Sequence, residues 1–169
     1  YHPPYSATRR VLEDVAPNPA LALDLEAHPS NLRLMAEARA SPERDIVIVT
    51  SDTSQLDIAT NLVANLADVG VHNYVVIAAT KDLCERISTR LACVWTSLMD
   101  PFRQRLQRAG TNMVRTNWLC RQIYVGRLSR LGFNPMLLDA DVILFHNPFA
   151  LIRQHLPGYQ AIFLGDTSA

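Results

Sequence analysis

The sequence predicts an α/β fold with three layers, in which helices cover both faces of a mostly parallel sheet. Two features predict it. Short apolar runs such as DIVIVT and YVVIAAT alternate with segments of helical periodicity, and a run of this kind suits a strand buried on both faces, as in a parallel sheet. The repeated order of strand, helix and strand then indicates parallel strands joined by right-handed crossovers.

Residues 1–44 precede the first of these strands. They are rich in proline and alanine, and we expect a loose leader followed by a helix near Ser30–Ala40. Pro42 ends that helix, because the residue before a proline avoids helical geometry. The chain is therefore expected to divide into a leader with one helix, residues 1–44, and the domain proper, residues 45–169.

The first half of the domain follows the alternation of strands and helices. A strand is expected over Asp45–Thr50, and the amphipathic helix after it ends at Gly70, because glycine commonly ends helices. The second strand is expected over Tyr74–Ala79, a short helix over Lys81–Arg90 and a third strand over Leu91–Trp95.

The second half begins with Thr96–Thr111, which is irregular and polar. A long loop in a compact domain is often functional. A long helix is expected over Met113–Leu131, followed by a strand within residues 135–145, PMLLDADVILF. Pro148–Leu156 is expected to form a short helix with proline at its first position, and Gln160–Leu164 a last strand.

The composition excludes some partners. The chain has 16 Lys and Arg against 16 Asp and Glu, a net charge of +0, so it has no broad attraction to nucleic acid or to a membrane surface. Phosphate binding would therefore need a local site. No apolar run is long enough to cross a bilayer. Because the chain begins at Tyr1 rather than Met, we expect a fragment or a processed product, with any membrane anchor or targeting segment outside it.

Three cysteines, Cys84, Cys93 and Cys120, have neither the CxxC spacing nor a zinc pattern. Core packing is the favoured interpretation, because a cysteine without a partner behaves as a small hydrophobic residue. One disulfide stays open as the alternative.

Asp139 and Asp141 mark the candidate site. Apolar residues flank the pair on both sides, and residues two apart on an extended chain point to the same side. Both carboxylates are thus expected together at the end of a buried strand, where open α/β sheets bind ligands. Because two buried negative charges oppose each other, the pair predicts a hard divalent cation, Mn²⁺ or Mg²⁺. Such an ion usually keeps positions for substrate phosphates.

An acidic pair of this spacing is unspecific by itself. The structural alternative is that the two aspartates cap turns or pair with arginines. Arg121 is the next candidate, because it falls within the apolar stripe of the predicted long helix, where a guanidinium needs an anion or must extend to water. Its helix leads into the acidic strand, so Arg121 is expected to approach the pair or a diphosphate and to stabilise negative charge in catalysis. The alternative is a structural arginine, ion-paired or extended to solvent.

The loop after the first strand holds three further candidates. Thr50, Ser51 and Asp52 offer hydroxyls and a carboxylate to the base or ribose of a nucleotide. The alternative is helix capping by Asp52 or Thr53. His146 is expected on a surface loop, with metal ligation as the alternative.

At LLDADVILFHNPF the sequence resembles the nucleotide-diphospho-sugar transferase family, which includes plant and algal cell-wall xylosyl- and arabinosyltransferases with a GT-A type, Rossmann-like fold. The family pattern is a glycine-ended helix, an apolar strand, DxD, Val with two apolar residues, and Asp or Asn before Pro. Here Gly132 precedes the strand and Asn147-Pro148 follows. DIVIVTSD and YVVIAAT resemble the first two family strands, so the resemblance spans roughly Asp45 to Asp166.

The resemblance implies transfer of a sugar from a nucleoside-diphosphate sugar, expected to be a UDP-sugar, to a hydroxyl of a glycan or glycoprotein acceptor. Asp139 would contact the ribose or the metal, and Asp141 would ligate Mn²⁺, which acts as a Lewis acid on the leaving diphosphate. Arg121 stands where the family often has a basic residue, commonly Lys, with a different donor geometry.

The same resemblance implies retention of anomeric configuration and residence in the Golgi lumen or secretory pathway. The acceptor-binding residues and a further metal ligand belong to a later part of the family with no counterpart here. We therefore expect a fold truncated at its C-terminus that keeps the donor site, with catalysis by this fragment alone in doubt.

Three other functions stay open. A phosphatase of the haloacid dehalogenase type also uses an apolar strand ending in DxD, but its Thr or Val four residues after the first Asp is Ile143 here, and its site normally lies near the start of the domain. A domain that binds nucleotide sugars without turnover predicts the same Mn²⁺ and nucleotide binding, but no transfer or hydrolysis. A purely structural α/β domain predicts no metal-dependent binding.

Overall fold

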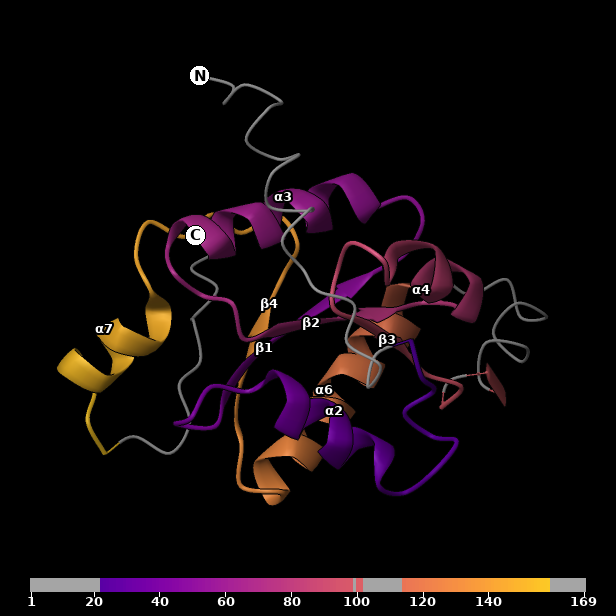
Figure 1. Ribbon diagram of the computed structural model, residues 1–169, viewed down its shortest axis with the longest axis horizontal. Helices are drawn as coiled ribbons and strands as arrows, with labels where there is room; N and C mark the ends of the chain where they lie inside the picture. Colours follow the sequence, from indigo (N-terminus) through magenta and orange to yellow (C-terminus); the bar gives the residue numbers. More distant parts are fainter. Residues whose placement is uncertain (1–21, 99, 102–113, 159–169) are drawn as a thin grey trace.

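The computed structural model describes residues 22–98, 100–101 and 114–158 (Figure 1). Its centre is a four-stranded parallel sheet in the order β3-β2-β1-β4. The strands are β1 at Asp45–Ser51, β2 at Tyr74–Ala78, β3 at Cys93–Trp95 and β4 at Asn134–Leu138. The α/β class and the parallel sheet predicted from the apolar runs are thus confirmed.

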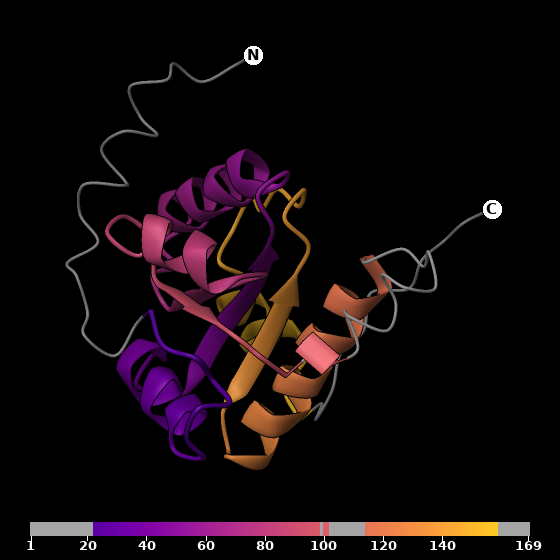
Figure 2. The same ribbon diagram turned by 90° about the vertical axis from the view of Figure 1, so that its right-hand side faces the viewer.

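Helices cover both faces of the sheet (Figures 1 and 2). Helices α3 (Leu56–Asp68) and α4 (Lys81–Ile87) lie on one face, and α2 (Asn31–Arg39) and α6 (Val114–Arg130) lie on the other. Handedness explains the arrangement. The chain steps from β1 to β2 and β3 in one direction and returns to β4 beyond β1, so right-handed connections place α3 and α4 on one face and α6 on the other.

The centre of the core is β1, whose residues Ile46, Val47, Ile48 and Val49 are each 0% exposed. Side chains alternate between the two faces of a strand, so a strand that is covered on both faces is apolar at every central position. β2 has the same character and is buried throughout. This double burial is the physical reason why these strands were visible in the sequence.

Residues 22–44 belong to this core. The Ala22 amide donates to the Cys93 carbonyl at 2.7 Å and the Leu25 amide to the Trp95 carbonyl at 3.0 Å, so this segment runs along the outer edge of β3. Helix α2 then buries Met35 and Ala36 completely. The expectation of a loose leader is wrong from residue 22 onward, while residues 1–21 lie outside the described residues.

The strand expected within residues 135–145 ends earlier, at Leu138. β4 pairs with β1 only as far as Leu138 opposite Val49, and the chain then turns, with the Val142 amide donating to the Asp139 carbonyl at 3.2 Å. The apolar residues after the turn suggested a strand, yet Ile143 is 70% and Phe145 83% exposed. Helix α4 likewise ends at Ile87, three residues before the expected Arg90.

The other predicted helices are confirmed. α2 and α6 lie within a residue or so of the expected bounds, and α7 spans Pro148–His155. Asn147 caps α7, because its side chain accepts hydrogen bonds from the amides of the first turn at 3.0 and 3.3 Å. The strand expected over Gln160–Leu164 and most of the loop Thr96–Thr111 lie outside the described residues.

Two further expectations concern the whole chain. Cys84, Cys93 and Cys120 are buried and unbridged, which confirms core packing. No helix in the described part of the chain is long and apolar enough to cross a membrane.

Asp45 begins β1 and is almost fully buried, at 2% exposed. Its carboxylate accepts a hydrogen bond from the Asn134 side chain of β4 at 3.1 Å and one from Arg153 of α7 at 2.6 Å. A buried carboxylate is stable only when it is paired and hydrogen-bonded. Asp45 therefore ties α7 to the amino ends of β1 and β4.

Replacing Arg153 with methionine is expected to lower the free energy of unfolding by roughly 1–3 kcal/mol, because a buried charge loses its partner. The Arg153 side chain is 52% exposed, so water screening favours the lower part of that range. Urea denaturation of the wild type, Arg153→Met, Asp45→Asn and the double variant measures it. If the losses in the free energy of unfolding of the two single variants add up to the loss in the double variant, the two side chains do not interact.

Candidate functional site

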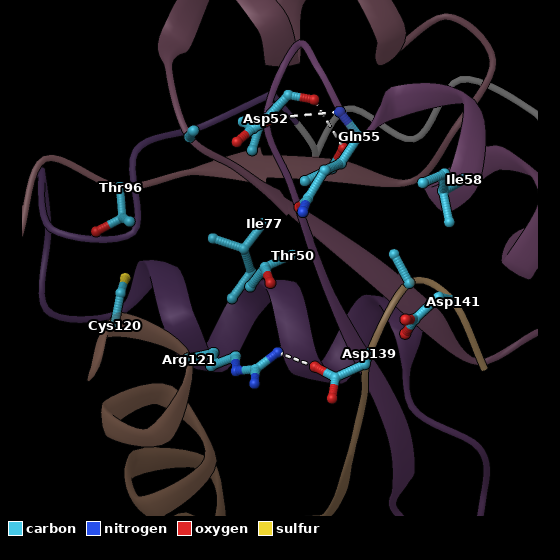
Figure 3. A pocket seen from close by; sticks show the side chains of 14 residues that line it. Thr50, Asp52, Gln55, Ile58, Ile77, Thr96, Cys120, Arg121, Asp139 and Asp141 are labelled. Carbon is cyan, nitrogen blue, oxygen red and sulfur yellow. Dashed lines mark hydrogen bonds and ion pairs between the residues drawn. The ribbon is translucent and has the colours of Figure 1, made fainter. Parts of the chain in front are cut away.

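A cavity of about 340 Å³ opens where the four strands end, within the size range of small-ligand sites. Its lining comes from the carboxyl ends of all four strands and from the first turns that follow, with α6 closing one side (Figure 3). The lining residues are Thr50, Ser51, Asp52, Gln55, Ile58, Ile77, Ala78, Ala79, Thr96, Cys120, Arg121, Asp139, Ala140 and Asp141. Every site residue predicted from the sequence is among them.

The cavity lies at the topological switch point of the sheet. From β1 the chain proceeds to β2 on one side, and it later returns to β4 on the other. Connections that leave in opposite directions open a crevice outside the carboxyl ends of the two central strands, which is where open α/β sheets bind ligands. The ends of β1 and β4 carry Thr50 to Asp52 and Asp139 to Asp141, so the two predicted groups of polar residues meet there.

Asp139 and Asp141 lie on the turn that follows β4, not on an extended strand. Both are exposed, and the Asp139 side chain has 57% of its surface open to solvent. The expectation of two deeply buried carboxylates on an extended chain is therefore wrong. The strand ends at Leu138, where its pairing with β1 ends opposite Val49. The turn still brings both side chains to the cavity.

Arg121 reaches the acidic pair from α6. The residue is only 8% exposed, and its Nη1 donates a hydrogen bond to Asp139 Oδ1 within an ion pair. Figure 3 shows the two side chains pointing toward each other across the cavity. The expectation that Arg121 approaches the pair is confirmed. Asp141, in contrast, has no hydrogen bond or ion pair with any residue that the structure describes.

Asp52 has a structural role in the loop after β1. Its Oδ1 accepts hydrogen bonds from the Ser54 amide at 2.8 Å, the Ser54 hydroxyl at 2.6 Å and the Gln55 amide at 3.0 Å. These contacts hold the turn that leads into α3, but Asp52 does not cap the helix as the alternative predicted, because the N-cap residue is Gln55 and has no side-chain cap. Asp52 also lines the cavity, so the residue that holds this turn borders the site as well.

Thr96 is a lining residue that the sequence analysis missed. It follows β3, is 1% exposed, and its hydroxyl shares a hydrogen bond with Tyr124 of α6. Tyr124 donates to Glu26 at 2.7 Å, and Arg127 pairs with the same carboxylate. Burial raises the pKa of the Tyr124 hydroxyl above its usual range; the Thr96 hydrogen bond opposes this in part, and Glu26 raises it further.

This network fixes the part of α6 that carries Arg121. Tyr124 lies three residues after Arg121, which places the two on neighbouring turns of one helix face. A polar residue directly after an apolar strand, as Thr96 is after β3, was the available signal, and it is the same signal that singled out Asp139.

Asn65 is the second residue that the sequence analysis missed. It lies on α3, and its side-chain amide brackets Leu144: Nδ2 donates to the Leu144 carbonyl at 2.9 Å, and Oδ1 accepts from the Leu144 amide at 2.7 Å. The bracket replaces the strand pairing that β4 loses after Leu138. It holds the segment that follows Asp141 against α3. The only hint in the sequence is an amide between the buried Leu62 and Leu66 of that helix.

The charges of the cavity suit a cation. Three carboxylates, from Asp52, Asp139 and Asp141, face a single guanidinium, from Arg121. Carboxylate oxygens are the ligands that Mg²⁺ and Mn²⁺ prefer. No cluster of three or more His, Cys, Asp or Glu with metal-site geometry occurs in the described ranges. The donor set therefore fits an ion held by two carboxylates and completed by water and ligand phosphates, as is common for Mg²⁺. His146 is exposed and outside the lining.

These features define an α/β domain with an acidic ligand site at the switch point of a parallel sheet. The family model of nucleotide-diphospho-sugar transferases matches residues 69–167, which is more than half of the chain. The protein therefore belongs to the nucleotide-diphospho-sugar transferase family. No curated protein and no solved structure matched the chain.

The matched range contains β2, β3, β4 and the turn with the acidic pair. The family transfers sugars from nucleotide-sugar donors. This assignment decides against a phosphatase of the haloacid dehalogenase type.

Asn65→Ala is expected to lower the free energy of unfolding by roughly 1–2 kcal/mol, because both backbone groups of Leu144 lose their partner. Asn61→Ala is the matched control. Asn61 is exposed on the same helix, so both variants gain the same helix propensity but only one loses the bracket. Urea denaturation compares them. Equal stabilities of the two variants would show that the bracket does not hold the segment.

Proposed function

We propose that this protein binds a nucleoside-diphosphate sugar, with UDP as the expected nucleotide, together with Mn²⁺ or Mg²⁺, and transfers the sugar to a hydroxyl of a glycan or glycoprotein. The observation that carries the proposal is the charge of the cavity. A diphosphate is an anion, yet three carboxylates and one guanidinium line the site. Repulsion opposes a bare diphosphate there, so a divalent cation is needed to join ligand and protein.

The roles that we propose for Asp139 and Asp141 differ because their surroundings differ. Asp141 has no partner among the described residues and is exposed toward the cavity, which makes it the first choice as a metal ligand. Asp139 lies beside it and pairs with Arg121, so it can serve the metal or the ribose. When bound, the metal supplies Lewis-acid stabilisation of the leaving diphosphate.

Arg121 provides the positive charge of the protein itself. Its guanidinium is almost buried in the cavity wall, where an ionic hydrogen bond is stronger than in water. A planar guanidinium can hold two phosphate oxygens at once. We propose that Arg121 contacts the diphosphate and stabilises the charge that develops as the bond between sugar and phosphate breaks.

The loop after β1 is proposed to bind the nucleoside. Thr50 and Ser51 end β1, and Asp52 and Gln55 line the cavity beyond them. The contacts of Asp52 Oδ1 with Ser54 and Gln55 preorganise this loop, so little freedom would be lost on binding. A xylosyl- or arabinosyltransferase activity, retention of configuration and Golgi residence rest on the resemblance to cell-wall enzymes and stay predictions.

The first test is calorimetric binding of UDP with and without Mn²⁺. The wild type is expected to bind UDP only with Mn²⁺, and Asp141→Ala to weaken that binding at least about tenfold, which corresponds to about 1.4 kcal/mol. Asp68→Ala is the control, because Asp68 is exposed at the far end of α3 and should bind like the wild type. A folded wild type that ignores UDP in the presence of Mn²⁺ contradicts the proposal.

Turnover separates an enzyme from a domain that only binds. With Mn²⁺ and a UDP-sugar, an enzyme is expected to release UDP, by transfer to an added acceptor or slowly to water. Replacing Arg121 with methionine should slow that release on the order of a hundredfold, the loss typical of one group that stabilises developing charge. The released UDP is measured by ion-pair chromatography. Tight Mn²⁺-dependent binding without release would support the binding-only alternative.

A further inference from the structure

The two carboxylates of the acidic pair are not equivalent. Asp139 forms an ion pair with Arg121, whereas Asp141 has no such partner in the part of the chain that is described. Arg121 already occupies Oδ1 of Asp139, which is one of the two carboxylate oxygens that a divalent cation would use. A cation beside that carboxylate would also meet the positive charge of Arg121. The pair therefore opposes metal binding as long as Arg121 stays on Asp139.

Arg121 cannot easily leave the cavity. Its side chain is only 10% exposed, and α6 is held by the Tyr124 contacts with Thr96 and Glu26 one turn further on. It is also the one cationic side chain among the residues that line the described cavity. For a diphosphate that enters the cavity, Arg121 is thus the cation of the lining, and a bidentate contact with phosphate belongs to the same strong class as a contact with a carboxylate.

We propose that Arg121 is an exchangeable counter-ion. It neutralises Asp139 until a donor binds, and it then moves to the diphosphate and releases Asp139 to the metal. The inference rests on the proposed function and adds a coupling to it: nucleotide and metal each favour the binding of the other through one side chain. Such coupling is reciprocal, so each ligand must raise the affinity of the other by the same factor.

Arg121→Met tests the exchange by binding alone. Without nucleotide, Mn²⁺ is expected to bind the Arg121→Met variant about tenfold more tightly than it binds the wild type, because the side chain that competes for Asp139 is gone. UDP at saturating Mn²⁺ is expected to bind about tenfold more weakly, because the diphosphate loses its cation. Arg130→Met is the matched control, since Arg130 is exposed at the end of the same helix, and neither affinity should change. Calorimetry and Mn²⁺ electron paramagnetic resonance give both constants.

Asp139→Asn gives an independent test that does not need the arginine variant to fold. Asp139 is largely exposed, so the substitution should be tolerated. It breaks the ion pair between Asp139 and Arg121, so inorganic pyrophosphate without metal is expected to bind about tenfold more tightly. Asp141→Asn removes the same charge but no contact with Arg121, and it should raise the pyrophosphate affinity clearly less.

The outcomes separate this inference from the proposed function. Opposite changes of the Mn²⁺ and UDP affinities in Arg121→Met, with a larger pyrophosphate gain in Asp139→Asn than in Asp141→Asn, support the exchange. A wild type that binds UDP with Mn²⁺, combined with an Arg121→Met variant whose Mn²⁺ affinity is unchanged or lower, overturns the exchange alone. Equal pyrophosphate gains in the two asparagine variants do the same. A wild type without Mn²⁺-dependent UDP binding overturns the proposed function and the exchange with it.

Discussion

The rest of the structure depends on the complete burial of β1. Helices cover both of its faces, and β2 and β4 pair with both of its edges. Only its ends can therefore hold polar side chains. At the amino end, Asp45 is tied by Asn134 and Arg153. At the carboxyl end, Thr50 to Asp52 face the cavity. The same burial that stabilises the domain confines its chemistry to one edge of the sheet.

At that edge the balance of charge decides what can bind. The cavity holds more carboxylates than cations, and the guanidinium that it does hold is already paired with Asp139. On the proposed function, this balance opposes an anionic donor by itself, and a divalent cation bound with the donor would remove that repulsion. A family that uses nucleoside-diphosphate sugars has the ligand that resolves this conflict. The charge of the cavity and the family assignment therefore support the same proposal.

The supports of the site lie outside the motif itself. Asn65 on α3 holds the segment after the acidic turn through Leu144, and Glu26, far away in sequence, steadies α6 through Tyr124. These contacts join residues separated by 79 and 98 positions. No local pattern could have indicated them, because a half-buried amide or a glutamate in a loop has no periodicity that marks a distant partner.

The sequence by itself determined the α/β class, the strands β1 and β2, the long helix before β4 and six of the residues that line the cavity, Thr50, Ser51, Asp52, Arg121, Asp139 and Asp141. These follow from local properties, because double burial demands apolar runs and polar residues can only follow where such runs end. The tertiary structure alone decided where β4 stops, how exposed Asp139 and Asp141 are, and which of them pairs with Arg121. Those features depend on pairing in space: β4 pairs with β1 only as far as Val49, and the apolar stretch that resembled a strand continues as a turn and an exposed segment.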